Sequence, residues 1–137
     1  MPVSVKREWF GDELEMRMRR AAGRGIVAIG MNVVRETKPI THRISGTLAR
    51  SVHAAPLGYE GYDEDEREAP SVDLMLLHGV PPATPTPLGA AVEVGSWLPY
   101  ACVEWVGRGH PGVTQGLELA RSQATSIMTR AFKEEGL

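Results

Sequence analysis

The stretch GDELEMRMRRAAGRGIVAIGMNVVRETK, residues 11–38, is the longest periodic segment of the chain and decides its fold class. Asp12 and Glu15 have the spacing of a capping box, which predicts a helix start there. Pro39 disfavours helix at the residue before it, so we expect the helix to end near Glu36. Apolar and small residues recur at steps of three and four, as on one face of an amphipathic helix: Leu14, Met18, Ala21, Ala22, Gly25, Ile29 and Val33.

Short strands are expected on either side of the middle of the chain. The candidates are Ser51–Ala55, Val72–Leu77 and Ala90–Val94, and residues 2–10 could add a short strand or an anchoring arm. The second candidate is apolar on both faces, which indicates a central strand.

A second long helix is predicted from about Val113 to Glu135, where Gly136 is a natural stop. The order helix, sheet, helix predicts one α+β domain over residues 1–137. We expect a long N-terminal helix, a small and mostly antiparallel sheet with extended loops, and a C-terminal helix packed on the sheet.

Two connections between these elements are unusual. Residues 58–70 hold an acidic run that cannot pack in a core and should form a solvated loop. Residues 79–89 carry four prolines, so we expect an extended arm that joins neither a helix nor a ladder.

Composition excludes several classes of protein. Lys and Arg number 15 against 17 Asp and Glu, and the net charge of −2 is unlike that of a protein that coats nucleic acid. Cys102 is the single cysteine, which excludes an internal disulfide and fits a reducing compartment. No apolar run approaches the ~20 residues of a membrane span, and the first residues lack the apolar core of a signal peptide. A soluble, unexported protein without a membrane partner is therefore expected.

The sequence offers no catalytic constellation. There is no G-x-S-x-G elbow, and Cys102 is expected to be a small buried hydrophobe. The histidines have no metal-ligand spacing on a helix, and we expect them to be scattered on the surface or half-buried: His42, His53, His78 and His110. We therefore expect no enzyme, no catalytic residue, no cofactor and no metal.

The segment GRGHPG, Gly107–Gly112, matches the letters of a dinucleotide fingerprint. That motif also needs a following strand, whereas the remaining 25 residues are helical in pattern. A glycine-rich loop before a helix can still hold an anion. A small anion- or nucleotide-binding domain that uses this loop and Arg108 stays open as an alternative.

A basic patch lies on the first predicted helix and includes Arg19 beside Arg17, Arg20 and Arg24. Such a patch suits nucleic-acid phosphates or an acidic partner. It also suits a solvated helix face paired with Asp12, Glu13 and Glu15. A DNA-contacting protein that uses these arginines is a third reading.

Two segments carry a resemblance: THRISGTLARSV, residues 41–52, and VEVGSWLPYACVEWVGR, residues 92–108. Together they resemble the neck or tail-completion proteins of long-tailed bacteriophages, the family related to minor tail protein Z. That family has a long first helix, a Thr-Gly-x-Leu-Arg-x-Ser-type turn, a Tyr-Ala-x-x-Val-Glu-aromatic-Gly segment and a closing helix. Here Gly107 comes one position late, and Val113–Gln115 replaces the usual Pro-Phe-Leu. The matching motif residues, expected to be structural, are Gly46, Leu48, Ser51, Tyr100, Glu104 and Trp105.

The resemblance implies a structural virion protein of the head–tail connector. Copies of the chain would form a ring, with six the expected number, between the head-closure proteins and the tail-terminator or tail-tube proteins. Double-stranded DNA would pass through the lumen without specific binding. The protein would be located in the virion neck, and in the host cytoplasm during assembly.

Some residues have expected places in such a ring. Carboxylates that face a DNA channel would repel phosphates and let the duplex slide: Asp63, Glu64, Asp65 and Glu66. The proline arm loses little entropy on ordering, so it suits docking to a neighbour. The candidate interface residues are Pro81, Pro82, Pro85, Pro87, Arg17, Arg20 and Arg24.

Overall fold

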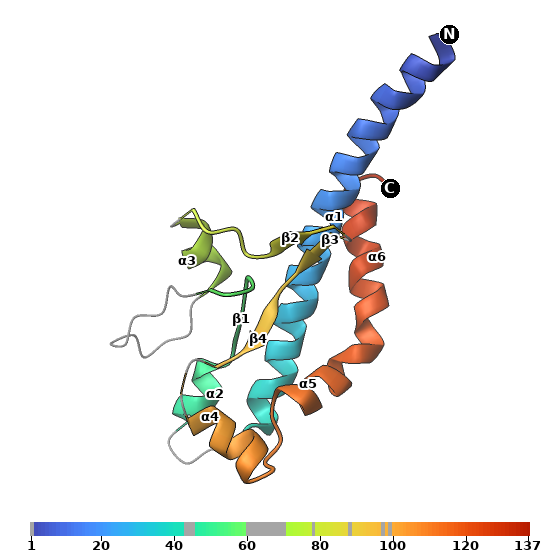
Figure 1. Cartoon of the computed structure of the whole chain (residues 1–137). Helices are drawn as coiled ribbons and strands as arrows, with labels where there is room; N and C mark the ends of the chain where they lie inside the picture. Colours follow the sequence, from blue (N-terminus) through green and yellow to red (C-terminus); the bar gives the residue numbers. More distant parts are fainter. Residues whose placement is uncertain are drawn as a thin grey trace.

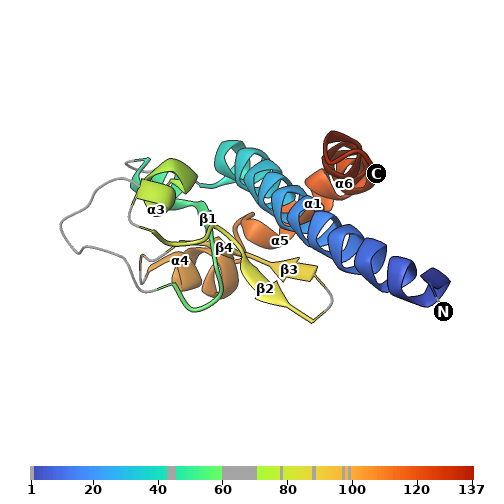
Figure 2. The same ribbon diagram turned by 90° about the horizontal axis from the view of Figure 1, so that it is seen from above.

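The long helix α1 (Pro2–Ile40) lies at the centre of the computed structural model (Figure 1). The structure describes residues 2–42, 46–59, 71–77, 79–87, 89–96, 98 and 100–137, and for residues 2–10, 72–74 and 100 it describes the backbone. The strands lie on one side of α1 and α6 on the other (Figure 2), and both α5 and α6 pack against α1. The N-terminal end of α1 extends past the other elements (Figure 1).

The remaining elements are short and make the predicted α+β class. After α1 come α2 (Thr47–Ser51), β1 (His53–Ala55), α3 (Val72–Leu77), β2 (Thr84–Thr86), β3 (Gly89–Ala91) and β4 (Glu93–Gly95). The chain then forms α4 (Tyr100–Cys102), the π-helical turn η1 (Val103–Gly107), α5 (Val113–Ala120), the 3-10 turn η2 (Arg121–Gln123) and α6 (Ala124–Glu134). Gly136 has φ of 80°, so the predicted glycine stop of the last helix is confirmed.

The described strands form two antiparallel pairs. β1 pairs with β4, where His53 lies opposite Gly95, and β2 pairs with β3, where Thr84 lies opposite Ala91. The predicted strand Ala90–Val94 is thus divided between two ladders, with Val92 at the change.

Close packing joins α1 to α5 and α6. Thr37 is fully buried, and its Oγ1 donates to the Val33 carbonyl at 2.7 Å. Gly116 of α5 lies against Thr37 so closely that a Cβ on the glycine would overlap the threonine side chain. Asn32, also buried, donates from Nδ2 to Gln123 Oε1 at 2.8 Å. The main contacts of the C-terminal helices are thus with α1, which itself lies against the strands, and not with the sheet as expected.

Both predicted ends of the first helix are wrong. The helix begins at Pro2, so residues 2–10 are neither a strand nor an arm, and Asp12 lies inside the helix. Proline is tolerated in the first turn of a helix, where its missing N–H has no partner to lose. At the other end the helix continues through Pro39 to Ile40 because the buried Thr37 is held by its packing on α5.

The predicted central strand Val72–Leu77 is also wrong, because this segment forms α3. Met75 is buried while Leu76 and Leu77 are exposed, so only one face of this short helix is covered. Six apolar residues are too few for periodicity to separate a helix from a buried strand.

The proline arm does join a ladder, contrary to expectation. Pro85 lies in β2 opposite Ala90 of β3. An edge strand tolerates proline because one of its sides needs no hydrogen-bond donor.

Candidate functional site

An apolar groove runs beside α1 where α3 and the proline arm approach it. Its volume is about 590 Å³. We call it the Met31 groove; its apolar lining is Val27, Ala28, Met31, Leu76, Pro82 and Ala83. Arg20, Arg24 and Glu135 form its polar side. The structure therefore brings three predicted interface residues, one from the arm and two from the helix, to the same groove.

Ion pairs on the polar side of the Met31 groove tie α1 to the end of α6. Glu135 Oε1 lies 2.9 Å from Arg24 Nη2, and Oε2 lies 3.7 Å from Arg20 Nε. The expected pairing of the patch with nearby acids is found for Arg19, whose Nη2 lies 3.1 Å from Glu15 Oε1. Arg20 and Arg24 are instead partly neutralised by a residue 111–115 positions away, which weakens the reading of this patch as a DNA contact.

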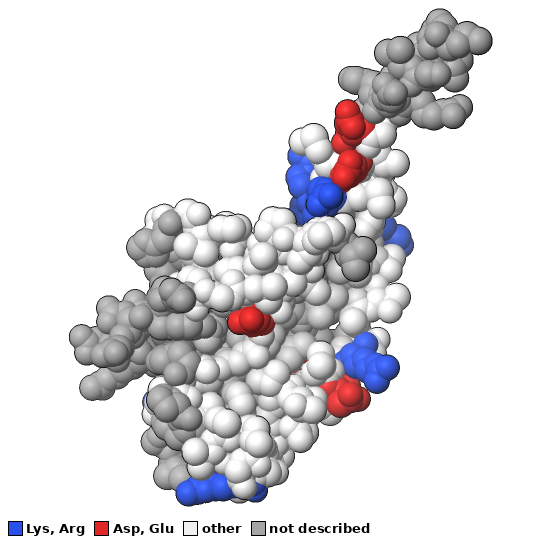
Figure 3. Space-filling model, viewed as in Figure 1, with Lys and Arg blue, Asp and Glu red and all other residues white. Residues whose placement is uncertain are grey.

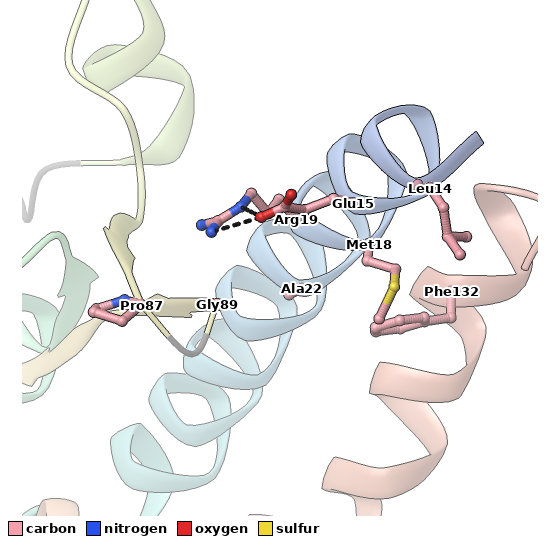
Figure 4. Close-up of a pocket in the computed structure, with 9 residues that line it drawn as sticks. Leu14, Glu15, Met18, Arg19, Ala22, Pro87, Gly89 and Phe132 are labelled. Atoms are coloured by element: carbon pink, nitrogen blue, oxygen red, sulfur yellow. Dashed lines mark hydrogen bonds and ion pairs between the residues drawn. The ribbon is translucent and has the colours of Figure 1, made fainter. Parts of the chain in front are cut away.

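A second groove, of about 310 Å³, lies nearer the N-terminus of α1. We call it the Met18 groove; its lining includes Leu14, Met18, Ala22, Pro87 and Phe132. Met18 extends toward Phe132 of α6, while Pro87 and Gly89 approach from the β2–β3 side (Figure 4). A second arm proline is thus placed beside α1.

The other predicted interface residues, Pro81, Pro85 and Arg17, line neither groove. Pro81 and Pro85 are exposed, and Arg17 is half-buried with its guanidinium near Gly136. The acidic residues expected to face a DNA channel, Asp63–Glu66, lie outside the described residues.

Large apolar side chains are exposed beyond the two grooves. On the face shown in Figure 3 a broad area over the strands carries few charged side chains, an acidic one near its middle being the exception, and other charged side chains gather along α1 and near the edges. The exposed apolar residues include Met16, Leu77, Val103, Val106, Leu117 and Leu119. These residues belong to α1, α3, η1 and α5, so the exposed apolar side chains are spread over several elements.

A polar cluster forms at the opposite end of α1 around Glu104, which is only 7% exposed. Its Oε2 accepts from His42 Nδ1 at 3.2 Å and from His110 Nδ1 at 2.7 Å. Its Oε1 accepts from Arg108 Nη1 at 2.8 Å. The imidazole centroids of His42 and His110 are 4.3 Å apart. The expectation that the histidines are scattered is wrong for this pair; His78 lies outside the described residues.

Sequence reasoning missed this cluster because its members come from the segment after α1, from η1 and from the loop before α5. His42 and Glu104 are 62 residues apart. A partial signal was present: Glu104 and Arg108 have the i, i+4 spacing of a helical ion pair, and His110 lies six residues from Glu104.

Electrostatics at the cluster favour the ionised carboxylate. The hydrogen bond from His110, then that from His42, holds the pKa of Glu104 below its ordinary value, and Arg108 acts in the same direction. Elsewhere, burial lowers the pKa of His53, whose Nδ1 donates to the Ser51 carbonyl at 2.8 Å.

The first family motif is structural in this chain. Gly46 has φ of 81° and precedes α2, a conformation that costs glycine little. Leu48 and Ser51 are buried, and Ser51 Oγ donates to the Leu48 carbonyl at 2.6 Å. Ser51 Oγ also lies 2.5 Å from Ser96 Oγ, which joins α2 to the segment after β4.

The second motif differs from expectation in which residues are buried. Ala101 and Glu104 face inward, whereas Val103 and Cys102 are exposed. Trp105 is half-buried against Gly112, and among the described residues its indole N–H has no hydrogen-bond partner. The segment from Val103 is a π-helical turn, in which the Arg108 N–H donates to the Val103 carbonyl five residues back. Tyr100 begins α4.

The Gly107–Gly112 loop leads into α5, and several of its hydrogen-bond donors are already used within the chain. Gly112 N–H donates to Gln115 Oε1 at 2.8 Å, His110 N–H donates to the Glu104 carbonyl, and Arg108 is paired with Glu104. The Glu104 carboxylate accepts hydrogen bonds from Arg108 and His110 of this loop. Its negative charge disfavours the binding of an anion there. The chain continues as α5 and α6, so the second strand of a dinucleotide unit is absent from residues 113–137.

Comparisons of the chain with protein-family models, with curated proteins and with solved structures gave no match. Within the described ranges, none of the helices has a stretch long and apolar enough to cross a lipid bilayer.

Proposed function

We propose that this chain is a structural subunit of the bacteriophage head–tail connector, a neck or tail-completion protein that acts through assembly and not through catalysis. The observation that carries the proposal is the pair of apolar grooves on α1, each of which includes a proline of the arm. Pro82 lines the Met31 groove and Pro87 lines the Met18 groove. Arg20 and Arg24, the helix residues proposed for the interface, border the first of them.

A ring subunit needs two different surfaces, because each copy meets one neighbour on either side. The Met18 and Met31 grooves and the exposed apolar residues of α5 supply surfaces of that kind. Copies joined in this way would form a closed ring, proposed to have six members, with the head-closure complex on one side and the tail-terminator or tail-tube proteins on the other. DNA would pass through the lumen without specific binding, and Asp63–Glu66 are proposed to face it.

The motif residues support the resemblance through their roles. Gly46, Ser51 and Glu104 each set the path of the backbone or join two segments. Residues that a family keeps for architecture are expected in such positions.

Deletion of the gene from the genome that carries it tests the function directly. We expect electron microscopy of the resulting lysate to show filled heads and separate tails, and complementation with the intact gene to restore joined particles. Joined, infectious particles in the deletion strain would refute the proposal.

A point substitution tests the groove itself. Met31→Glu places a charge in the Met31 groove at a side chain that is half exposed, so the subunit should fold with an unchanged circular dichroism spectrum. We expect this variant to fail in complementation. Ser126→Glu, which adds the same charge on the exposed face of α6, is the matched control and should complement normally. Equal complementation by both variants would exclude the Met31 groove as an interface.

A further inference from the structure

The cluster around Glu104 has the composition and geometry of a transition-metal site. His42 follows the end of α1, Glu104 lies in η1, and His110 lies in the loop before α5. One ligand atom from each of these three residues lies within 4.8 Å of the others. Two imidazole nitrogens and a carboxylate oxygen are a common ligand set for Zn²⁺, whereas Ca²⁺ and Mg²⁺ prefer oxygen ligands alone.

Two of the three ligand separations are close to those around a tetrahedral ion, and the third, between the two imidazoles, is at most 4.8 Å. Two ligands at about 2.1 Å from a tetrahedral Zn²⁺ are roughly 3.4 Å apart. The Nδ1 atoms of His42 and His110 lie 3.2 and 2.7 Å from Glu104 Oε2. Binding therefore requires these separations to widen by roughly 0.2–0.7 Å, with the ion replacing the Nδ1 protons that now point at the carboxylate.

The surroundings of the cluster also fit. Arg108 holds Glu104 Oε1 at 2.8 Å, which leaves Oε2 directed at the two imidazoles. The backbone N–H of His110 donates to the Glu104 carbonyl at 3.0 Å and fixes the loop to the π-helical turn. Supporting contacts of this kind orient metal ligands. The side chains of His42 and His110 are 44% and 35% exposed, which gives an ion a route in and leaves room for water as a fourth ligand.

We propose that His42, Glu104 and His110 bind one Zn²⁺-type divalent ion, with solvent completing the coordination. The ion would fasten the end of α1 to η1 and to the loop that begins α5, so its role is structural. This inference does not depend on the connector function: it concerns one subunit, and the two fail separately.

The test uses the full chain after treatment with a chelator. Isothermal titration with zinc sulfate should give one equivalent bound, cobalt chloride should give the intense visible absorption of a tetrahedral Co²⁺ site, and zinc should raise the melting temperature. His42→Ala and His110→Ala should each weaken zinc binding by about tenfold or more and remove the cobalt absorption.

Cys102→Ser is the control, because Cys102 is an exposed thiol and thus a competing zinc ligand outside the cluster. This variant should bind zinc as the intact chain does. The absence of stoichiometric binding, binding that survives His110→Ala, or binding lost with Cys102→Ser would each overturn the proposal. His42 is at the surface, so His42→Ala is expected to fold and keeps the test decisive.

Discussion

The two halves of α1 carry one continuous amphipathic stripe, but only one half is covered by the chain itself. From Ala21 to Thr37 the stripe is buried or half-buried, with Ala21, Val33 and Thr37 between 0 and 3% exposed. Nearer the N-terminus, Leu14 and Met18 of the same stripe are each 46% exposed. The buried stripe stabilises the subunit. The exposed half of the stripe, like the Met31 groove on another side of the helix, leaves apolar area that we propose a partner covers.

In the buried half, the packing is expected to be most sensitive to substitution at the contact between Gly116 and Thr37. Gly116→Ala places a methyl group on the threonine side chain, and overpacking of this kind should lower the free energy of unfolding by about 2–3 kcal/mol. Gly23→Ala is the same change in α1 at a position with nothing within 4 Å, and it should stabilise the helix by about 0.5–1 kcal/mol. Urea denaturation of both variants measures the difference. Equal effects would mean that α5 does not pack on α1 as described.

The hydrogen bond between Asn32 and Gln123 tests the polar link in the buried half. Asn32→Ala should cost about 1–2 kcal/mol, because a buried amide loses its partner and leaves a small cavity. Gln123→Ala alone should cost less, since Gln123 is exposed. A double-mutant cycle by urea denaturation gives the coupling, and a coupling near zero would contradict the bond.

Acid should weaken the end of the molecule that holds Glu104. The pKa of Glu104 is lower in the folded chain than its ordinary 4.5, so its stabilising effect is present above that pH and is lost as the pH falls below it. The pKa of His53 is also lowered, from 6.5, so its contribution is lost earlier, as the pH falls below about 6.5. Melting temperatures measured with a chelator present should therefore fall in two stages. Glu104→Gln should flatten the lower stage only, and an unchanged lower stage would contradict the assignment.

The smallest effect on stability is expected in the exposed half of α1. Met16 is 62% exposed, so Met16→Gln should change the free energy of unfolding by no more than about 0.5 kcal/mol. Val33→Ala, in the buried half, should cost at least about 1 kcal/mol through lost methyl groups. Thermal denaturation compares the two. A large loss from Met16→Gln would show that the two halves do not differ.

The α+β class, the long first helix, the glycine stop at Gly136 and the turn at Gly46 could be predicted from the sequence. The helix predicted from Val113 to Glu135 is right in position but is divided into α5 and α6 by the 3-10 turn η2. These features depend on residue spacing or on one residue's backbone preference, and both act within a few positions. The same local reasoning placed a strand at Val72–Leu77 and ended α1 too early, since short apolar runs and a single proline are decided by what packs on them.

Local patterns in the chain determined that α1 would be long and apolar on one face. The tertiary structure alone decided which part of that face is covered, that one arm proline and two helix arginines share a groove, and that His42 and His110 meet on Glu104. The physical reason is range: helix periodicity repeats every 3.6 residues, whereas burial and ion pairing depend on partners that folding brings from as far as 115 residues away.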